Sequence, residues 1–197
     1  MRHNPFGGLT DQELRRAIVP NDILSDIIKD VESKESYMVQ LVGKKGRGKT
    51  LHLKILQQLF DEYPIYLLDE NIDLKTIDRT ESKIFFIDSI QHIRFMKRIQ
   101  LYRRAHKIVF TTHHHRLHEF FLAGTKHKTY LMKGLDEQVL GNAIKKRIAI
   151  AADINDFNQV EINQKLVRQL LRKYGDDFRS ILNYLYDQFK HAHYDCR

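Results

Sequence analysis

Residues 43–50 have the types and spacing of a phosphate-binding loop. They read Gly-Lys-Lys-Gly-Arg-Gly-Lys-Thr, which is the Gly-x4-Gly-Lys-Thr pattern. Glycines can take backbone angles closed to other residues, so successive N–H groups turn inward onto phosphate oxygens. Lys49 would reach the β- and γ-phosphates, and the Thr50 hydroxyl would bind Mg²⁺. The pattern therefore predicts a site for ATP or ADP with Mg²⁺, formed by Gly43, Lys44, Lys45, Gly46, Arg47, Gly48, Lys49, Thr50 and Leu51.

An acidic residue follows a later apolar run, where a nucleotide-bound metal needs one. The run Ile-Phe-Phe-Ile occupies residues 84–87 and ends at Asp88. Phosphate-bound Mg²⁺ is commonly held by an aspartate at the end of a strand near the loop. We therefore expect Thr50 and Asp88 to hold Mg²⁺ together. The alternative is that Asp88 only caps a helix after a core strand.

A basic segment follows Asp88. No acid occurs before Glu119, while the interval holds seven lysines and arginines and six histidines. A solvated helix face normally mixes both signs of charge, so this segment predicts an anionic partner. The partner is DNA or an acidic protein face, such as a neighbouring subunit. The nucleic-acid candidates are Arg94, Lys97, Arg98, Arg103, Arg104 and Lys107.

The histidines of this segment do not predict a metal site. His113, His114 and His115 are consecutive, and His118 follows. Consecutive side chains at the end of a strand point in alternating directions, and no cysteine or acid completes a ligand set.

The elements that must position these residues alternate between strand and helix. Short apolar runs at 37–42, 64–68, 84–87, 107–112 and 129–132 predict five strands. Helical periodicity between them favours crossover helices and a mainly parallel sheet. After residue 134 the apolar spacing is helical throughout. We therefore predict an α/β fold, a P-loop αβα sandwich over residues 1–134, followed by a small helical lid over 135–197.

Composition excludes several other classes of protein. The chain has 197 residues, a formal net charge of +8 and 42% hydrophobic residues, which is enough apolar material for a core. No apolar run approaches the length of about 20 residues that spans a bilayer. The N-terminus lacks the apolar region of a signal peptide. A single cysteine, Cys196, cannot form an internal disulfide, so we expect a cytoplasmic protein with no membrane association.

From about residue 16 to 190 the chain resembles AAA+ ATPases. The order of parts matches: a Pro-containing segment, the loop at 43–50 (Walker A), the strand at 84–88 (Walker B), a polar-ended strand at 107–113 and a helical lid. The lid residues 174–185 read Tyr-Gly-Asp-Asp-Phe-Arg-Ser-Ile-Leu-Asn-Tyr-Leu. They are similar to the family's sensor 2 helix, with one extra residue between Gly175 and Asp177. The chain looks most like initiator and clamp-loader modules.

The resemblance implies roles for further residues. Ile18, Val19 and Pro20 would flank the adenine. Thr112 or His113 would be sensor 1, which polarises the attacking water. Arg179 would touch the γ-phosphate from the lid as sensor 2; the alternative is a surface arginine paired with Asp176 or Asp177. The set expected to act in catalysis is Lys49, Asp88, Thr112 and Arg179.

Two departures from the family concern hydrolysis. The Walker B strand of the family usually ends in two acids, but here Asp88 is followed by Ser89, and a serine cannot accept a proton from water as a carboxylate does. Where the family has an arginine finger, this chain has Lys126, which lacks the bidentate fork of arginine. The sequence therefore predicts a weak ATPase that acts as a nucleotide-dependent switch on DNA and can form a homo-oligomer. The alternative is a non-hydrolysing adaptor that docks a partner protein through its basic face.

Overall fold

The chain folds into two compact units. The computed structural model describes residues 4–10, 13, 16–17, 22–68, 77, 82, 84–154, 156 and 159–194. One unit comprises Asn21–Lys133, and the other combines Met1–Pro20 with Gly134–Arg197. Each unit has a hydrophobic core of its own.

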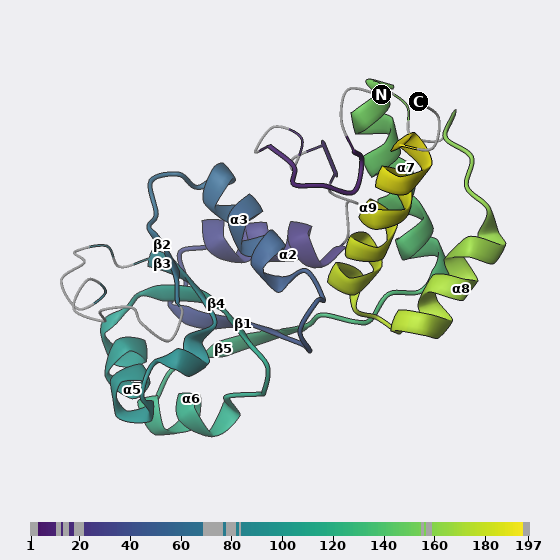
Figure 1. Cartoon of the computed structure of the whole chain (residues 1–197). Coiled ribbons are helices and arrows are strands. Elements are labelled where there is room, and N and C mark those ends of the chain that lie inside the picture. Colours follow the sequence, from purple (N-terminus) through teal and green to yellow (C-terminus); the bar gives the residue numbers. More distant parts are fainter. Residues whose placement is uncertain are drawn as a thin grey trace. The chain divides into compact units, whose positions relative to one another are not determined.

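A five-stranded parallel sheet forms the centre of the first unit (Figure 1). The strands are β1 (Tyr37–Val42), β2 (Ile65–Leu67), β3 (Ile84–Asp88), β4 (Lys107–Thr112) and β5 (His127–Leu131). Their order is β2-β3-β4-β1-β5, and every neighbouring pair is parallel. The predicted α/β fold with a parallel five-stranded sheet is confirmed. Because β4 lies between β1 and β3, its carboxyl end separates the loop that follows β1 from Asp88.

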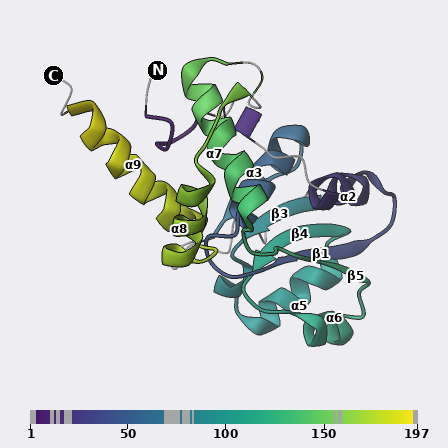
Figure 2. The same cartoon turned by 90° about the vertical axis from the view of Figure 1, so that its right-hand side faces the viewer.

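Helices cover both faces of this sheet. Figures 1 and 2 show α2 (Asp22–Glu32) and α3 (Lys49–Leu59) on one face, and α5 (Phe95–Arg104) and α6 (Leu117–Ala123) on the other. A short 3₁₀ helix, η1 (Ile90–His92), joins β3 to α5. The sequence analysis did not predict α6. Its first turn has no side-chain cap, so it lacks the polar signal that marks most helix starts.

In the part of the second unit that follows residue 134, the structure describes three helices. They are α7 (Glu137–Ala152), α8 (Gln164–Tyr174) and α9 (Phe178–Tyr194). The Asp136 carboxylate accepts a hydrogen bond from the Val139 N–H at 2.7 Å, and Asn163 caps α8 in the same way. Their apolar faces meet in a shared core formed by Leu140, Ile144, Val167, Leu170, Ile181 and Leu185. Within the described part of the chain, no helix has the length and apolar character needed to cross a membrane.

The N-terminal segment belongs to the helical unit, whereas the sequence analysis placed it in the α/β unit. The Arg147 guanidinium donates to the Gly7 carbonyl at 3.0 Å. The Asn4 amide donates to the Tyr186 carbonyl at 3.0 Å. The ring of Phe6 meets that of Phe189 edge-on, with centroids 6.4 Å apart. These contacts with α7 and α9 join residues far apart in the sequence, so a local sequence pattern could not predict them.

Candidate functional site

The glycines of the loop between β1 and α3 are required by its shape. Gly46 and Gly48 have φ angles of 84° and 74°, in the region that side chains disfavour. Gly43 was expected to need a similar backbone angle, but its φ is not positive, and crowding is the reason it must be glycine. An added Cβ would lie 3.0 Å from the Met132 Cβ and 3.1 Å from the Met132 carbonyl oxygen. Glycine at these three positions thus allows the tight turn that a loop binding an anion through its N–H groups requires.

Lys49 lies at the base of this loop. Its ammonium donates to the carbonyl oxygens of Gly43 and Lys44, both at 2.7 Å. The side chain is largely buried, and this desolvation lowers the pKa of Lys49, while the nearby Asp88 charge acts in the opposite direction. A cation held by loop carbonyls beside the N-terminus of α3 is placed to meet phosphate oxygens.

Asp88 joins α3 to the end of β4 through two threonines. Thr50 donates its hydroxyl hydrogen bond to the Asp88 carboxylate at 2.8 Å, and Thr111 donates to the other carboxylate oxygen at 2.5 Å. The predicted magnesium pair, Thr50 and Asp88, therefore lies in direct contact. Hydroxyl and carboxylate oxygens suit Mg²⁺, which binds proteins through one or two such ligands.

Thr111 is a site residue that the sequence analysis did not single out. Besides donating to Asp88, its hydroxyl oxygen accepts the Ser89 N–H at 2.7 Å. Thr112, which with His113 is one of the two residues expected as sensor 1, donates to the His114 carbonyl at 3.0 Å and lies 3.4 Å from the Arg116 Nε. Neighbouring residues of a strand face opposite sides of the sheet, so one of the two threonines faces Asp88 and the other faces away. His113 lies at the loop, with its Nδ1 3.2 Å from the Gly43 carbonyl oxygen.

Ser89 has an unusual backbone. Its φ and ψ are 62° and 52°, a left-handed conformation that costs a non-glycine residue about 1–3 kcal/mol. The hydrogen bond from its N–H to Thr111 stabilises this conformation. The residue in the position of the family's second acid is thus held rigidly, but it carries a hydroxyl instead of a carboxylate.

The remaining predicted nucleotide contacts are distributed as follows. Arg47 donates to the Met132 carbonyl at 3.1 Å and ties the loop to the segment after β5, while Lys44 and Lys45 are exposed. Val19 and Pro20 lie outside the described residues. Arg179 is exposed in the first turn of α9 in the helical unit, where Asp177 accepts its backbone N–H at 3.1 Å. Its sensor 2 role remains a prediction.

Two of the six nucleic-acid candidates are buried and serve the fold. Lys107 donates to the carbonyls of Asp30 and Ser33 at 2.6 and 2.7 Å, and so caps the C-terminal end of α2. Arg98 forms a buried ion pair with Glu119, 2.6 Å between Nη2 and Oε1. Neither can face DNA, and the prediction is wrong for both. The reason is physical: a buried cation must be paired inside the protein, and Lys107 and Arg98 find their acceptors in the α2 end and in Glu119.

The other four candidates remain on the surface. Arg94, Lys97, Arg103 and Arg104 are exposed. Arg103 donates to the Leu122 carbonyl at 2.8 Å, and Arg104 donates to the Ile77 carbonyl at 2.7 Å. These bonds fix the direction of two side chains without neutralising their charge.

A second basic surface, absent from the predictions, lies on α8. The helix contains no acid, and its exposed residues include Lys165, Arg168, Arg172 and Lys173. The Arg168 Nε lies 2.9 Å from a Glu137 carboxylate oxygen. The lack of acids in the sequence of α8 is a signal that could have revealed this surface.

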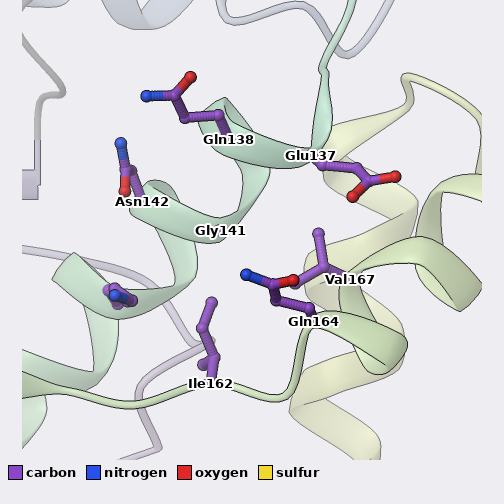
Figure 3. A pocket seen from close by; sticks show the side chains of 8 residues that line it. Glu137, Gln138, Gly141, Asn142, Ile162, Gln164 and Val167 are labelled. Atoms are coloured by element: carbon purple, nitrogen blue, oxygen red, sulfur yellow. The ribbon is translucent and has the colours of Figure 1, made fainter.

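The helical unit also contains a pocket of about 300 Å³. It lies between α7 and the start of α8, and Figure 3 shows the carboxamides of Gln138, Asn142 and Gln164 around it. Gly141, Ile162 and Val167 also line it. None of the residues predicted to bind nucleotide lines this pocket.

Solved structures share the fold, whereas no family model and no curated protein matches the sequence. One of these structures is the crystal structure of a DNA replication initiation factor, with 11% identity and a TM-score of 0.55 over 92% of this chain and 62% of that one. Another is AMPPCP-bound DnaA from Aquifex aeolicus, with 14% identity and a TM-score of 0.56 over 89% of this chain and 64% of that one. This chain thus spans less than two thirds of the length of either structure. The predicted resemblance to initiator-type AAA+ proteins is confirmed at the level of the fold.

Proposed function

We propose that the chain binds ATP with Mg²⁺ and acts as a slowly hydrolysing, nucleotide-dependent switch on DNA, in replication, transposition or defence. One observation supports it above all: Thr50 and Asp88, from different elements, meet at 2.8 Å at the base of a loop shaped by Gly46 and Gly48. A structural neighbour of the same fold is bound to AMPPCP.

The residues present fit a nucleotide and its metal. The loop N–H groups and the N-terminus of α3 would bind phosphate oxygens, and Lys49 would exchange its two loop carbonyls for them. Thr50 and Asp88 would hold Mg²⁺, which neutralises phosphate charge when bound. Thr111 orients the Asp88 carboxylate through its own hydrogen bond.

Slow hydrolysis follows from Ser89 and Lys126. General-base catalysis by a positioned carboxylate contributes about 10²–10⁴-fold to rates of this kind, and Ser89 supplies none. Lys126 is exposed directly before β5, and as a point charge it lacks the planar fork of arginine.

DNA is the proposed target because groups of exposed cations favour a polyanion. Arg94, Lys97, Arg103 and Arg104 provide one such surface, and α8 provides another. One structural neighbour is a DNA replication initiation factor. Binding should weaken steeply with salt and should differ between the ATP and ADP states.

Nucleotide binding is tested by calorimetric titration of ATP with and without Mg²⁺. Lys49→Ala should weaken binding at least tenfold. The matched control is Lys54→Ala, an exposed lysine on the same helix, which should leave affinity unchanged. Unaltered affinity in the Lys49→Ala protein would refute the loop assignment.

The second candidate function is a non-hydrolysing adaptor that docks a partner protein through its basic face. Ser89 favours it, because the position of the second acid is occupied by a strained serine. Single-turnover measurements with radiolabelled ATP separate the two candidates, since an adaptor gives no product. Ser89→Glu should raise the rate of a weak ATPase; an unchanged rate would show that the missing carboxylate is not what limits hydrolysis.

A further inference from the structure

Helix α6 turns its apolar side outward. Of its seven residues, Leu117, Phe121 and Leu122 are exposed by 49%, 86% and 51%, while the charged Glu119 is fully buried beside Phe120. A surface helix normally does the reverse and buries its apolar stripe. Single exposed apolar residues are common, but a contiguous group of them marks an interaction site.

The start of α5 extends this apolar group. Phe95 and Met96 are exposed by 39% and 65%. Phe95 stacks on His118 of α6, with centroids 6.3 Å apart and an interplanar angle of 12°. At the other end of the pair, Arg103 of α5 donates to the Leu122 carbonyl, so the two helices run side by side in the same direction (Figure 1). We call the five side chains the α6 surface: Phe95, Met96, Leu117, Phe121 and Leu122.

The α6 surface rests on a rigid foundation. The Glu119 carboxylate accepts from Arg98 on α5 at 2.6 Å and from Arg116 at 3.2 Å. Below it, Phe120 packs against Tyr102 and Phe110, with ring centroids 5.3 and 6.0 Å away. A buried ion pair and an aromatic cluster fix α6 on α5, so the outward position of Phe121 is built into the fold and does not depend on a loose helix.

The exposed charges on α5, α6 and the residues between these two helices have one sign. Arg94, Lys97 and Arg103 are exposed on α5, and His118 is exposed on α6. The only acid between residues 89 and 123 is Glu119, which is buried. A partner must therefore match an apolar centre with an acidic rim.

We propose that the α6 surface docks an acidic amphipathic helix of a partner protein. Apolar residues at helical spacing would cover Phe121 and Leu122, and flanking carboxylates would face the arginines, as in helix-in-groove recognition. Nucleic acid fits less well, because Met96, Leu117 and Leu122 offer no stacking face. Docking uses neither the phosphate loop nor the α8 cations, so it is separable from nucleotide binding. It does use Arg94, Lys97 and Arg103, which are also proposed above as DNA contacts, so the partner helix and DNA would compete for this face.

The probe is a fluorescent 18-residue peptide with leucines at helical spacing and glutamates elsewhere, titrated by anisotropy. Its control carries lysines in place of the glutamates. The intact chain should bind the acidic peptide at least tenfold more tightly than the basic one. Phe121→Ser should weaken acidic-peptide binding at least tenfold, whereas Leu59→Ser, at an equally apolar position that is 52% exposed on α3, should leave it unchanged.

A charge reversal provides a second, independent readout. The double variant Arg94→Glu with Lys97→Glu should prefer the basic peptide. Thermal unfolding checks that each variant is folded. Lys49→Ala should bind the acidic peptide with the affinity of the intact chain, so that a failure of the nucleotide proposal is distinguished from a failure of the docking proposal.

Four results would overturn the proposal. The first is that the intact chain does not bind the acidic peptide. The second is that the Phe121→Ser protein binds this peptide as tightly as the intact chain does. The third is that Phe121→Ser instead abolishes binding to anionic vesicles or a DNA oligonucleotide. The fourth is that the intact chain self-associates in sedimentation and Phe121→Ser abolishes that self-association, which would make a second copy the occupant.

Discussion

Replacing Thr111 with valine removes a single hydroxyl from the centre of the candidate site. That hydroxyl donates to the Asp88 carboxylate at 2.5 Å and accepts the Ser89 N–H at 2.7 Å. Valine matches the shape of threonine but not its hydroxyl, so packing within the buried end of β4 is retained. The substitution therefore isolates two hydrogen bonds.

The magnitude follows from the nature of these bonds. A hydrogen bond to a charged group contributes about 1.5–3 kcal/mol, and a neutral one contributes about 1 kcal/mol. Ser89 also loses the contact that holds its left-handed backbone. We expect Thr111→Val to lower the free energy of unfolding by about 3 kcal/mol. Because Asp88 is then free to turn, the Mg²⁺-dependent part of ATP affinity should fall about tenfold, which corresponds to about 1.4 kcal/mol.

Urea unfolding measures the first quantity, and ATP titration with and without Mg²⁺ measures the second. Thr112→Val is the matched control: it is equally buried, but its hydroxyl contacts His114 and Arg116 instead of Asp88. It should lower stability and leave the Mg²⁺ dependence intact. If both variants changed the Mg²⁺ dependence equally, or neither did, Thr111 would not be the residue that orients Asp88.

Three further predictions concern the fold and the backbone. Lys107→Met should lower the free energy of unfolding by about 2–4 kcal/mol, because the carbonyls of Asp30, Val31 and Ser33 lose the hydrogen bonds from Lys107. It should leave the salt dependence of DNA binding unchanged; a smaller salt slope would show that Lys107 contacts DNA. Glu119→Gln should destabilise the fold by about 3–5 kcal/mol in urea unfolding, because it leaves the buried Arg98 without a counter-charge. Burial would raise the pKa of Glu119, but hydrogen bonds and charges from Arg98 and Arg116 outweigh it and hold the pKa below its ordinary value. The stabilisation is therefore present above the ordinary pKa of a glutamate and is lost as pH falls through the folded value. Stability measured against pH should fall less steeply in the variant. Ser89→Gly should raise the unfolding free energy by about 1 kcal/mol by relieving the left-handed backbone; a loss of stability would mean that the serine hydroxyl makes a stronger contribution than the strain.

The sheet and the phosphate loop could be predicted from sequence because their signals are local. A buried apolar run, a glycine-rich turn and a helix follow one another within residues 37–59, and each agrees with the next. The contact between Thr50 and Asp88 could also be anticipated, since the carboxyl ends of parallel strands share one edge. Helix α6 could not, because Leu117, Phe121 and Leu122 are exposed while the charged Glu119 is buried beside Phe120, so its apolar residues do not mark one buried face.

The cations show why charge in a sequence does not by itself map a surface. Arg98 and Lys107 lie among exposed arginines and lysines, in a run that reads as one basic face. Their burial depends on acceptors from distant parts of the chain: Glu119 for Arg98, and the end of α2 for Lys107. Only the tertiary fold decides which cation of such a run meets an internal acceptor.

The end of β4 shows that the sequence does not predict which face of a strand each side chain occupies, and this choice matters for function. The sequence Thr-Thr-His at residues 111–113 gives no indication of which hydroxyl faces Asp88, because a shift of one residue exchanges the two faces of a strand. Pairing with β1 fixes this choice by setting Leu41 opposite Thr111 and Val42 opposite Thr112. Thr111 then contacts Asp88, while Thr112 lies beside Arg116, which binds Glu119 under the α6 surface. Adjacent residues of one strand thus contact the candidate nucleotide site and the residues that support the α6 surface. A displacement of this strand end would therefore change both sites.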